Sequence, residues 1–187
     1  EEILMNKCKI LLIPSVVFVL CFTMSACFIP GVTLNGRFTE EIDLSFAAAG
    51  IGVIDADTTN GSITVNASDT QEIKVHAEKT IRALTDEKAK EYAAEVELFA
   101  ETEGDTLKVY YEHPKGWKQV QVNIQYTIDC PPSIALRLGT TNGNIEVTGV
   151  NKAVEANTTN GNIGLTGGEE TIILRTTNGN VDIDNSK

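Results

Sequence analysis

One cysteine stands in a sequence context that indicates covalent chemistry. Cys27 follows Ser25 and Ala26. Small residues at the last two positions before a cysteine are what the bacterial lipoprotein peptidase requires. The sulfur of such a cysteine is diacylated, and the residue becomes the new amino terminus. We therefore predict lipidation at Cys27.

The segment before Cys27 reads as an export signal that begins at Met5. Lys7 and Lys9 form a short basic region, and the apolar stretch Ile10–Phe22 follows. Three interpretations stay open: a lipoprotein signal over residues 1–26, an ordinary signal peptide cleaved near Ala26, and an uncleaved anchor of about 20 residues. The basic start, apolar run and small-residue exit favour the first. We expect an exported chain that is lipid-anchored to the bacterial cell envelope, at the outer membrane or the cell surface, with residues 27–37 as a linker.

The other reactive residue types are sparse and scattered. His76 and His113 are the only histidines, and Cys130 is a lone thiol without a base beside it in sequence. No His, Cys and carboxylate residues share the spacing of metal ligands, and the nucleophile-elbow, P-loop and dinucleotide motifs are missing. We predict no catalytic residue, no cofactor, no metal and no enzymatic activity.

The charge of the chain disfavours one class of partner. Fifteen Lys and Arg residues stand against 26 Asp and Glu residues, which gives a net charge of -11. An acidic chain lacks the basic patch that displaces counterions from phosphates. Nucleic acid is therefore not an expected partner, whereas an unidentified protein or glycan is.

A repeat in the sequence predicts the strands that would carry any binding surface. The tetrapeptide Thr-Thr-Asn-Gly begins at Thr58, Thr140, Thr158 and Thr176, and the last three copies are 18 residues apart. A fixed period of this size is typical of solenoids. Apolar residues flank every copy at steps of two, the period of a strand; they are Ile54, Ala56, Ile63, Val65, Leu136, Leu138, Ile145, Val147, Val154, Ala156, Ile163, Leu165, Ile172, Leu174, Val181 and Ile183.

The Asn-Gly steps admit two interpretations. A pair that tolerates φ > 0 makes a tight turn, so a meander of hairpins is one possibility. The fixed period favours stacked coils of about 18 residues, in which equivalent Thr and Asn side chains hydrogen-bond to their copies above and below. We predict a structural turn ladder in which each glycine has φ > 0; its members are Asn60, Gly61, Asn142, Gly143, Asn160, Gly161, Asn178 and Gly179.

A segment without the repeat separates the first copy from the others. Thr85–Ala94 is predicted as a helix with Thr85 as its cap. Val96–Ala100 and Thr106–Tyr111 should form a hairpin, and Val120–Ile128 alternates as a half-buried strand. We thus expect an all-β domain over residues 38–187, a β-solenoid akin to a single-stranded β-helix, with a small helix-plus-hairpin insertion at about 78–130.

Each end of the predicted domain carries a further signal. Phe38–Leu44 should pair as a leading strand. The chain stops at Lys187 with Val181 and Ile183 stacked on one side only. Solenoids normally end in a polar cap, so we expect a truncation at the C-terminus.

These residues resemble the bacterial "putative adhesins" of the DUF4097 group over roughly residues 38–187. The resemblance rests on Asp57–Val65, on the Glu-rich helix followed by Gly104–Leu107, and on a proline before the serial coils, where Cys130-Pro131-Pro132 replaces the usual Val-Pro. It implies an all-β solenoid on exported or membrane-attached proteins, some of them encoded beside envelope-stress systems. The family supplies no catalytic residues.

Three functions compete at this stage. The leading one is a surface-anchored, non-catalytic β-solenoid that serves adhesion or acts as a binding scaffold of the cell envelope. The second is an accessory protein of an envelope-stress or signalling system that binds a membrane partner. The third is a polysaccharide-active β-helix enzyme, which coils of 18 residues disfavour because they leave little room for a groove.

Overall fold

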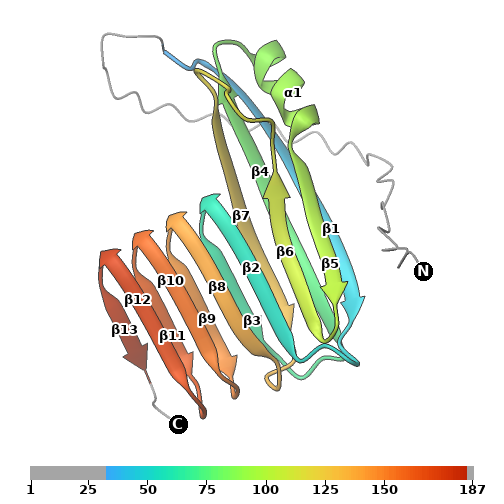
Figure 1. Cartoon of the computed structure of the whole chain (residues 1–187), viewed down its shortest axis with the longest axis vertical. Coiled ribbons are helices and arrows are strands. Elements are labelled where there is room, and N and C mark those ends of the chain that lie inside the picture. Colours follow the sequence, from blue (N-terminus) through green and yellow to red (C-terminus); the bar gives the residue numbers. More distant parts are fainter. Residues whose placement is uncertain (1–32, 185–187) are drawn as a thin grey trace, which may run out of the picture. The chain divides into compact units, whose positions relative to one another are not determined.

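The computed structural model describes residues 33–184, which form two β-sheets and one helix (Figure 1). The predicted signal peptide over residues 1–26 and the predicted lipidation site Cys27 lie outside these described residues. The prediction of an all-β chain with one short helix is confirmed, and both sheets are mixed and open.

The first sheet has seven strands in the order β1-β4-β7-β3-β9-β11-β13. β4 pairs antiparallel with β1 and β7, whereas every pair from β7 to β13 is parallel. The strands are β1 (Gly36–Ala47), β3 (Ile63–Ala67), β4 (Glu72–Ala83), β7 (Gln121–Cys130), β9 (Ile145–Val150), β11 (Ile163–Gly167) and β13 (Val181–Asp184).

The second sheet has six strands in the order β12-β10-β8-β2-β6-β5. All its pairs are parallel except the last, which is the predicted hairpin of β5 and β6. The strands are β2 (Val53–Asn60), β5 (Glu97–Glu103), β6 (Thr106–Glu112), β8 (Ala135–Asn142), β10 (Val154–Asn160) and β12 (Ile172–Asn178).

The chain passes from one sheet to the other at each Asn-Gly step. β2, β8, β10 and β12 lie side by side in the second sheet, and the strands that follow them, β3, β9, β11 and β13, lie side by side in the first (Figure 1). Asn60 pairs with Asn142, Asn142 with Asn160, and Asn160 with Asn178. Equivalent residues of successive repeats are therefore direct neighbours.

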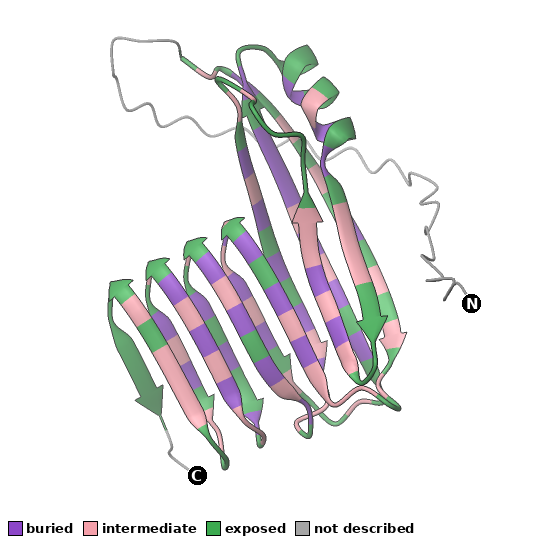
Figure 2. Cartoon of the chain, viewed as in Figure 1, coloured by how far each residue is buried: buried purple, intermediate pink, exposed green. Residues whose placement is uncertain are grey.

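The core lies between the two sheets and follows the period of two (Figure 2). Twelve of the sixteen flanking apolar residues of the repeats are buried. The exceptions all belong to β12 and β13, where Ile172 and Leu174 are partly buried and Val181 and Ile183 are exposed. Alternation therefore sets which side chains face inward, and a neighbouring repeat on each side completes their burial.

The predicted helix is α1 (Asp86–Glu95), and it packs against β1 and β4. The Thr85 hydroxyl accepts a hydrogen bond from the Lys88 amide at 3.3 Å, as expected of an N-cap. At the other end, the buried Lys79 ammonium donates to the carbonyls of Ala93 and Val96 and pairs with Glu40 at 2.7 Å. A cation at the negative end of the helix fixes α1 onto the first sheet.

The non-repeating strands join the repeats directly. β7 has the predicted alternation, with Val122, Ile124, Tyr126, Ile128 and Cys130 buried. It pairs in parallel with β3, and β6 pairs in parallel with β2. Each sheet is consequently continuous from the non-repeating strands into the strands of the serial repeats.

Candidate functional site

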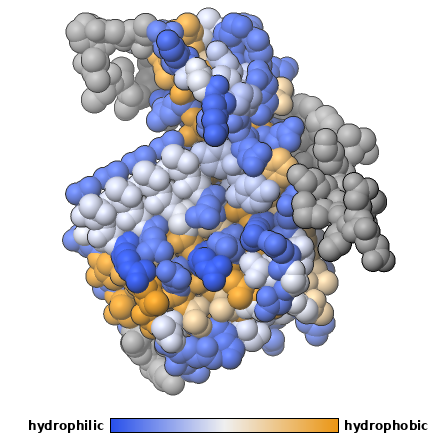
Figure 3. All heavy atoms as spheres, in the orientation of Figure 1, coloured by the Kyte–Doolittle hydropathy of each residue, from blue (hydrophilic) through white to orange (hydrophobic). Residues whose placement is uncertain are grey.

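The asparagines of the four Asn-Gly steps form an unbroken chain of side-chain hydrogen bonds. The Nδ2 atom of each donates to the Oδ1 atom of the preceding one at 2.8 Å, from Asn178 to Asn160, Asn142 and Asn60. Asn60 Nδ2 in turn donates to the carbonyl of Val122 at 3.2 Å. Figure 3 shows the hydrophilic row along the edge where β2, β8, β10 and β12 end. Asn142 and Asn160 are thus held on both sides, each through one of its two N–H donors and one acceptor site of its oxygen.

The first threonine of each tetrapeptide points inward and is buried, except for Thr176, which is partly buried. The hydroxyls of Thr140, Thr158 and Thr176 donate to the carbonyls of Gly61, Gly143 and Gly161 at 2.9–3.0 Å. The expectation that each threonine bonds to its own copies was therefore wrong. The hydroxyl bonds instead to the backbone of the preceding turn, which has a carbonyl within reach.

The predicted positive φ occurs at only one of the four ladder glycines. Gly61 has a φ of 143°, whereas Gly143, Gly161 and Gly179 do not have positive φ. Contact between backbones explains the glycine at these three positions. A Cβ atom there would lie 1.9–2.0 Å from the carbonyl oxygen of the glycine one coil earlier. Glycine is thus required by the close stacking of the turns.

The residue after each glycine forms a second column that the sequence analysis missed. The side-chain oxygen of Asn144 accepts from the Asn162 amide, and that of Asn162 accepts from the Asn180 amide, both at 2.9 Å. Ser62 accepts from the Asn144 amide in the same manner at 3.3 Å. The signal was present, because Ser62, Asn144, Asn162 and Asn180 occupy equivalent places in the repeat.

Within residues 33–184, His76, His113 and Cys130 make no hydrogen bond or ring contact with one another. His76 Nδ1 lies 2.7 Å from Asp43 Oδ1 on the outer face of the first sheet, and within residues 33–184 no hydroxyl or thiol is hydrogen-bonded to its ring. His113 stacks on Trp117 with their ring centroids 5.1 Å apart. Burial raises the pKa of Cys130 to about 11, so its thiol stays protonated at neutral pH.

Carboxylates on the repeat do not gather around a common point. The Glu146 side chain lies over Gly164, where a Cβ atom would be 2.0 Å from its Oε2. Residues 33–184 contain no group of three or more His, Cys, Asp or Glu side chains suited to hold a metal ion. The described part of the chain also holds no helix that is long and apolar enough to cross a membrane.

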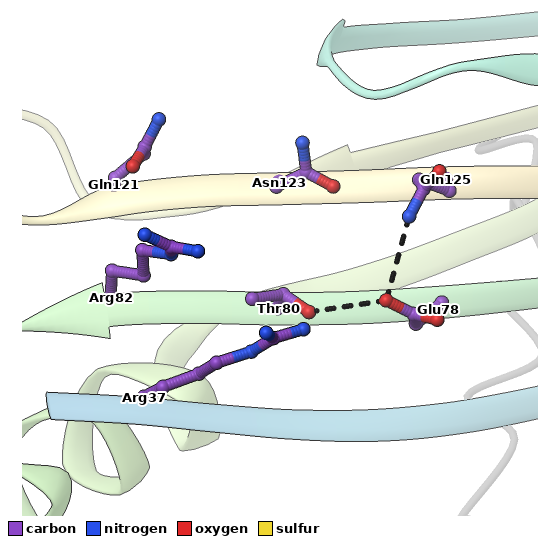
Figure 4. Close-up of a pocket in the computed structure, with 7 residues that line it drawn as sticks. All are labelled: Arg37, Glu78, Thr80, Arg82, Gln121, Asn123 and Gln125. Atoms are coloured by element: carbon purple, nitrogen blue, oxygen red, sulfur yellow. Dashed lines mark hydrogen bonds between the residues drawn. The ribbon is translucent and has the colours of Figure 1, made fainter. Parts of the chain in front are cut away.

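A shallow polar depression of about 360 Å³ lies on the outer face of β1, β4 and β7 (Figure 4). Its side chains come from the three antiparallel strands and not from the repeats; they are Arg37, Glu78, Thr80, Arg82, Gln121, Asn123 and Gln125. Glu78 Oε1 accepts from the Thr80 hydroxyl at 3.3 Å and from Gln125 Nε2 at 3.4 Å. None of these residues was singled out from the sequence.

Comparison with known proteins gives structural likenesses only. No family model and no curated protein matches the chain. A "putative cell adhesion protein" from Clostridium sporogenes is 9% identical with a TM-score of 0.44, over 79% of this chain and 99% of that one. "Putative adhesins" from Parabacteroides distasonis (10% identity, TM-score 0.38, 81% and 66% of the two chains) and Parabacteroides merdae (12%, 0.34, 80% and 78%) are also similar. With TM-scores below 0.5, these likenesses carry no conclusion about function.

Proposed function

We propose that the chain is an exported, non-catalytic binding protein of the bacterial cell envelope, anchored by lipid at Cys27, with an adhesin-like role. In this proposal the serial coils form a β-solenoid module that keeps the sheets rigid. The outer sheet faces meet the partner, which is a protein or a glycan. The lipid holds the domain at the outer membrane or the cell surface.

The observation that carries the proposal is the division of polar side chains between the two parts of the described domain. In the ladder, the Asn amides are held in place by hydrogen bonds of 2.8 Å to one another. On β1, β4 and β7, by contrast, polar groups face outward around an open depression. A rigid scaffold with an open polar face suits the binding of an extended partner, whereas enzyme pockets usually bury most of a small ligand.

The anchor is tested by labelling with a fatty acid. Cells that produce the full chain are grown with labelled palmitate, and the wild type is compared with Cys27→Ala. Cys130→Ala serves as the matched control, because the Cys130 thiol is buried and therefore not accessible to the lipid-transferring enzyme. We expect label in the wild type and the control and none in Cys27→Ala. Equal label in all three proteins would contradict lipidation at Cys27.

The binding role is tested on the same cells. Cells that display the wild type should adhere to an immobilised panel of proteins and glycans more strongly than cells that produce Cys27→Ala. A reducing-sugar assay on every glycan of the panel should show no turnover. Adhesion that does not depend on the protein, or release of reducing ends, would overturn the proposed function.

A further inference from the structure

The depression on β1, β4 and β7 is organised in cross-strand rows. Arg37 is the direct partner of Arg82, which pairs with Gln121 on the next strand. The second row is Thr39, Thr80 and Asn123, and the third is Glu41, Glu78 and Gln125. The face therefore changes from cationic through neutral to acidic along about five residues of each strand.

The cationic row is unfavourable for the folded chain alone. Like charges placed directly opposite on neighbouring strands are destabilising. Neither guanidinium has an ion pair within residues 33–184, and Arg37 Nε donates only to the Thr39 hydroxyl, at 3.3 Å. The other two arginines, Arg137 and Arg175, are both paired with carboxylates. Within residues 33–184 these two adjacent guanidinium groups thus have no ion-pair partner, and the nearby Asp86 carboxylate accepts instead from the Arg37 backbone amide at 2.8 Å.

The neighbouring groups add neutral donors and acceptors. Within the described residues, the side-chain amides of Gln121 and Asn123 make no hydrogen bond, so their donors and acceptors stay available. Glu78 is held in place by Thr80 and Gln125. In Figure 4 both guanidinium groups extend over the sheet toward the row of Thr80 and Asn123. Charged and amide groups therefore converge on the same open space.

We propose that this depression binds an acidic carbohydrate. The planar guanidinium groups of Arg37 and Arg82 hold its anionic substituent through paired N–H donors, for which arginine is well suited. The amides of Gln121 and Asn123 bond to its hydroxyl groups. The net charge of -11 opposes the binding of a polyanion, so we expect its affinity to depend on these two arginines. This inference rests on the proposed binding role and names its ligand class.

The experiment measures binding of the full chain, purified in detergent, to four probes. Oligogalacturonate carries carboxylates, dextran sulfate carries sulfates, a teichoic acid carries phosphates, and neutral dextran carries no charge. The three acidic probes distinguish the sources of the anion. We expect at least one of them to bind, with an affinity that falls as salt is raised, and no binding of neutral dextran.

Substitutions then locate the site. Arg37→Gln and Arg82→Gln should each weaken binding about tenfold or more, which corresponds to the loss of a charge-assisted hydrogen bond. Arg137→Gln and Arg175→Gln remove the same charge from the other sheet and should leave affinity within about twofold. Because like-charge repulsion is relieved, Arg82→Gln should not lower the melting temperature, and weaker binding cannot then be ascribed to unfolding.

Two results would overturn the site, and both differ from a failure of the proposed function. Either no acidic probe binds, or Arg37→Gln and Arg82→Gln bind as tightly as the wild type. If cells still adhere in a lipid-dependent manner, the binding role stands and this site is wrong. If labelling and adhesion fail while the arginines still control binding of an acidic probe, the site stands and the anchored role is wrong.

Discussion

The serial strands from β8 to β13, which lie in both sheets, and the antiparallel strands β1, β4 and β7 of the first sheet pair in different ways. In the serial strands, equivalent positions of successive repeats are neighbours, and at the Asn-Gly turn a side chain has a copy of itself beside it, as in the column of Asn142, Asn160 and Asn178. Between β1 and β4 a row still pairs like residues, such as Arg37 with Arg82, but between β4 and β7 it combines different ones, such as Arg82 with Gln121. Identical neighbours favour columns of self-complementary bonds, whereas different neighbours allow charge and amide groups to be combined.

This difference separates stability from recognition. Self-complementary columns hold their side chains to one another, as the amides of the ladder do. Mixed rows leave groups such as Asn123 available. The coils should therefore respond to substitution with a loss of stability, and the face of β1, β4 and β7 with a loss of binding. Four substitutions test this division, in order of decreasing effect.

The largest effect is expected from Ile163→Asp in the middle coil. Ile163 is 1% exposed in β11, so the variant buries an unpaired carboxylate. We expect a loss of about 4 kcal/mol or more in the free energy of unfolding, measured by urea titration. Thr166→Asp, exposed on the same strand, is the control and should change stability little. Equal unfolding midpoints for the two variants would refute the assigned faces.

Next is Gly161→Ala, which tests the close stacking of the turns. Its Cβ atom would meet the Gly143 carbonyl oxygen at 2.0 Å, so the two coils must separate. We expect a loss of about 3 kcal/mol. The control is Gly116→Ala, where a Cβ atom meets nothing within 4 Å but φ is 88°, so only about 1 kcal/mol is lost. A smaller loss at Gly161 than at Gly116 would argue against backbone contact.

Asn160→Ala should have an intermediate effect. Asn160 donates to Asn142 and accepts from Asn178, so Asn160→Ala should lower the free energy of unfolding by about 2 kcal/mol. Asn178→Ala removes one such bond and should lower it by about 1 kcal/mol. Asn123→Ala is the matched control in the mixed rows and should cost under about 0.5 kcal/mol. Far-UV circular dichroism and Trp117 fluorescence together report on both parts of the domain. If Asn123→Ala destabilises as much as Asn160→Ala, the division fails.

The smallest expected effect is a gain in stability, for the substitution Asp57→Asn. Burial, and then repulsion by Asp55, raise the pKa of Asp57, while Arg137 lowers it in part. A raised pKa in the folded state means that the folded chain binds this proton more tightly than the unfolded chain does. The contribution of Asp57 to stability therefore decreases as pH rises through its pKa.

The measurement for Asp57→Asn is the melting temperature across pH. The variant should be slightly more stable than the wild type at pH 7, and the difference should vanish below about pH 4, where both states are protonated. Asp69→Asn, at an exposed turn, removes the same charge as a control. A gain that does not change with pH would contradict the titration of Asp57.

Local patterns in the sequence predicted the elements well. The step of two placed Ile145, Val147, Ile163 and Leu165 in the core, and Thr85 announced the helix start, because both signals depend on near neighbours alone. The role of the ladder glycines was misread, since the distance between Gly161 and Gly143 is set by the stacking of coils. The pairing of Arg37 with Arg82 was invisible for the same reason, as 45 residues separate them in the chain.

The exact register of β8, β10 and β12 has a consequence for the inheritance of such a gene. Because each 18-residue unit presents the next one with the same backbone hydrogen-bonding pattern that it receives, an in-frame duplication or deletion of one whole unit leaves the backbone register at every junction unchanged. A shift by any other number of codons breaks the columns. A change of length in steps of 54 base pairs, which is 18 codons, should therefore be neutral for the coils. It does not alter the row of Arg37 and Arg82, because neither residue belongs to a repeat.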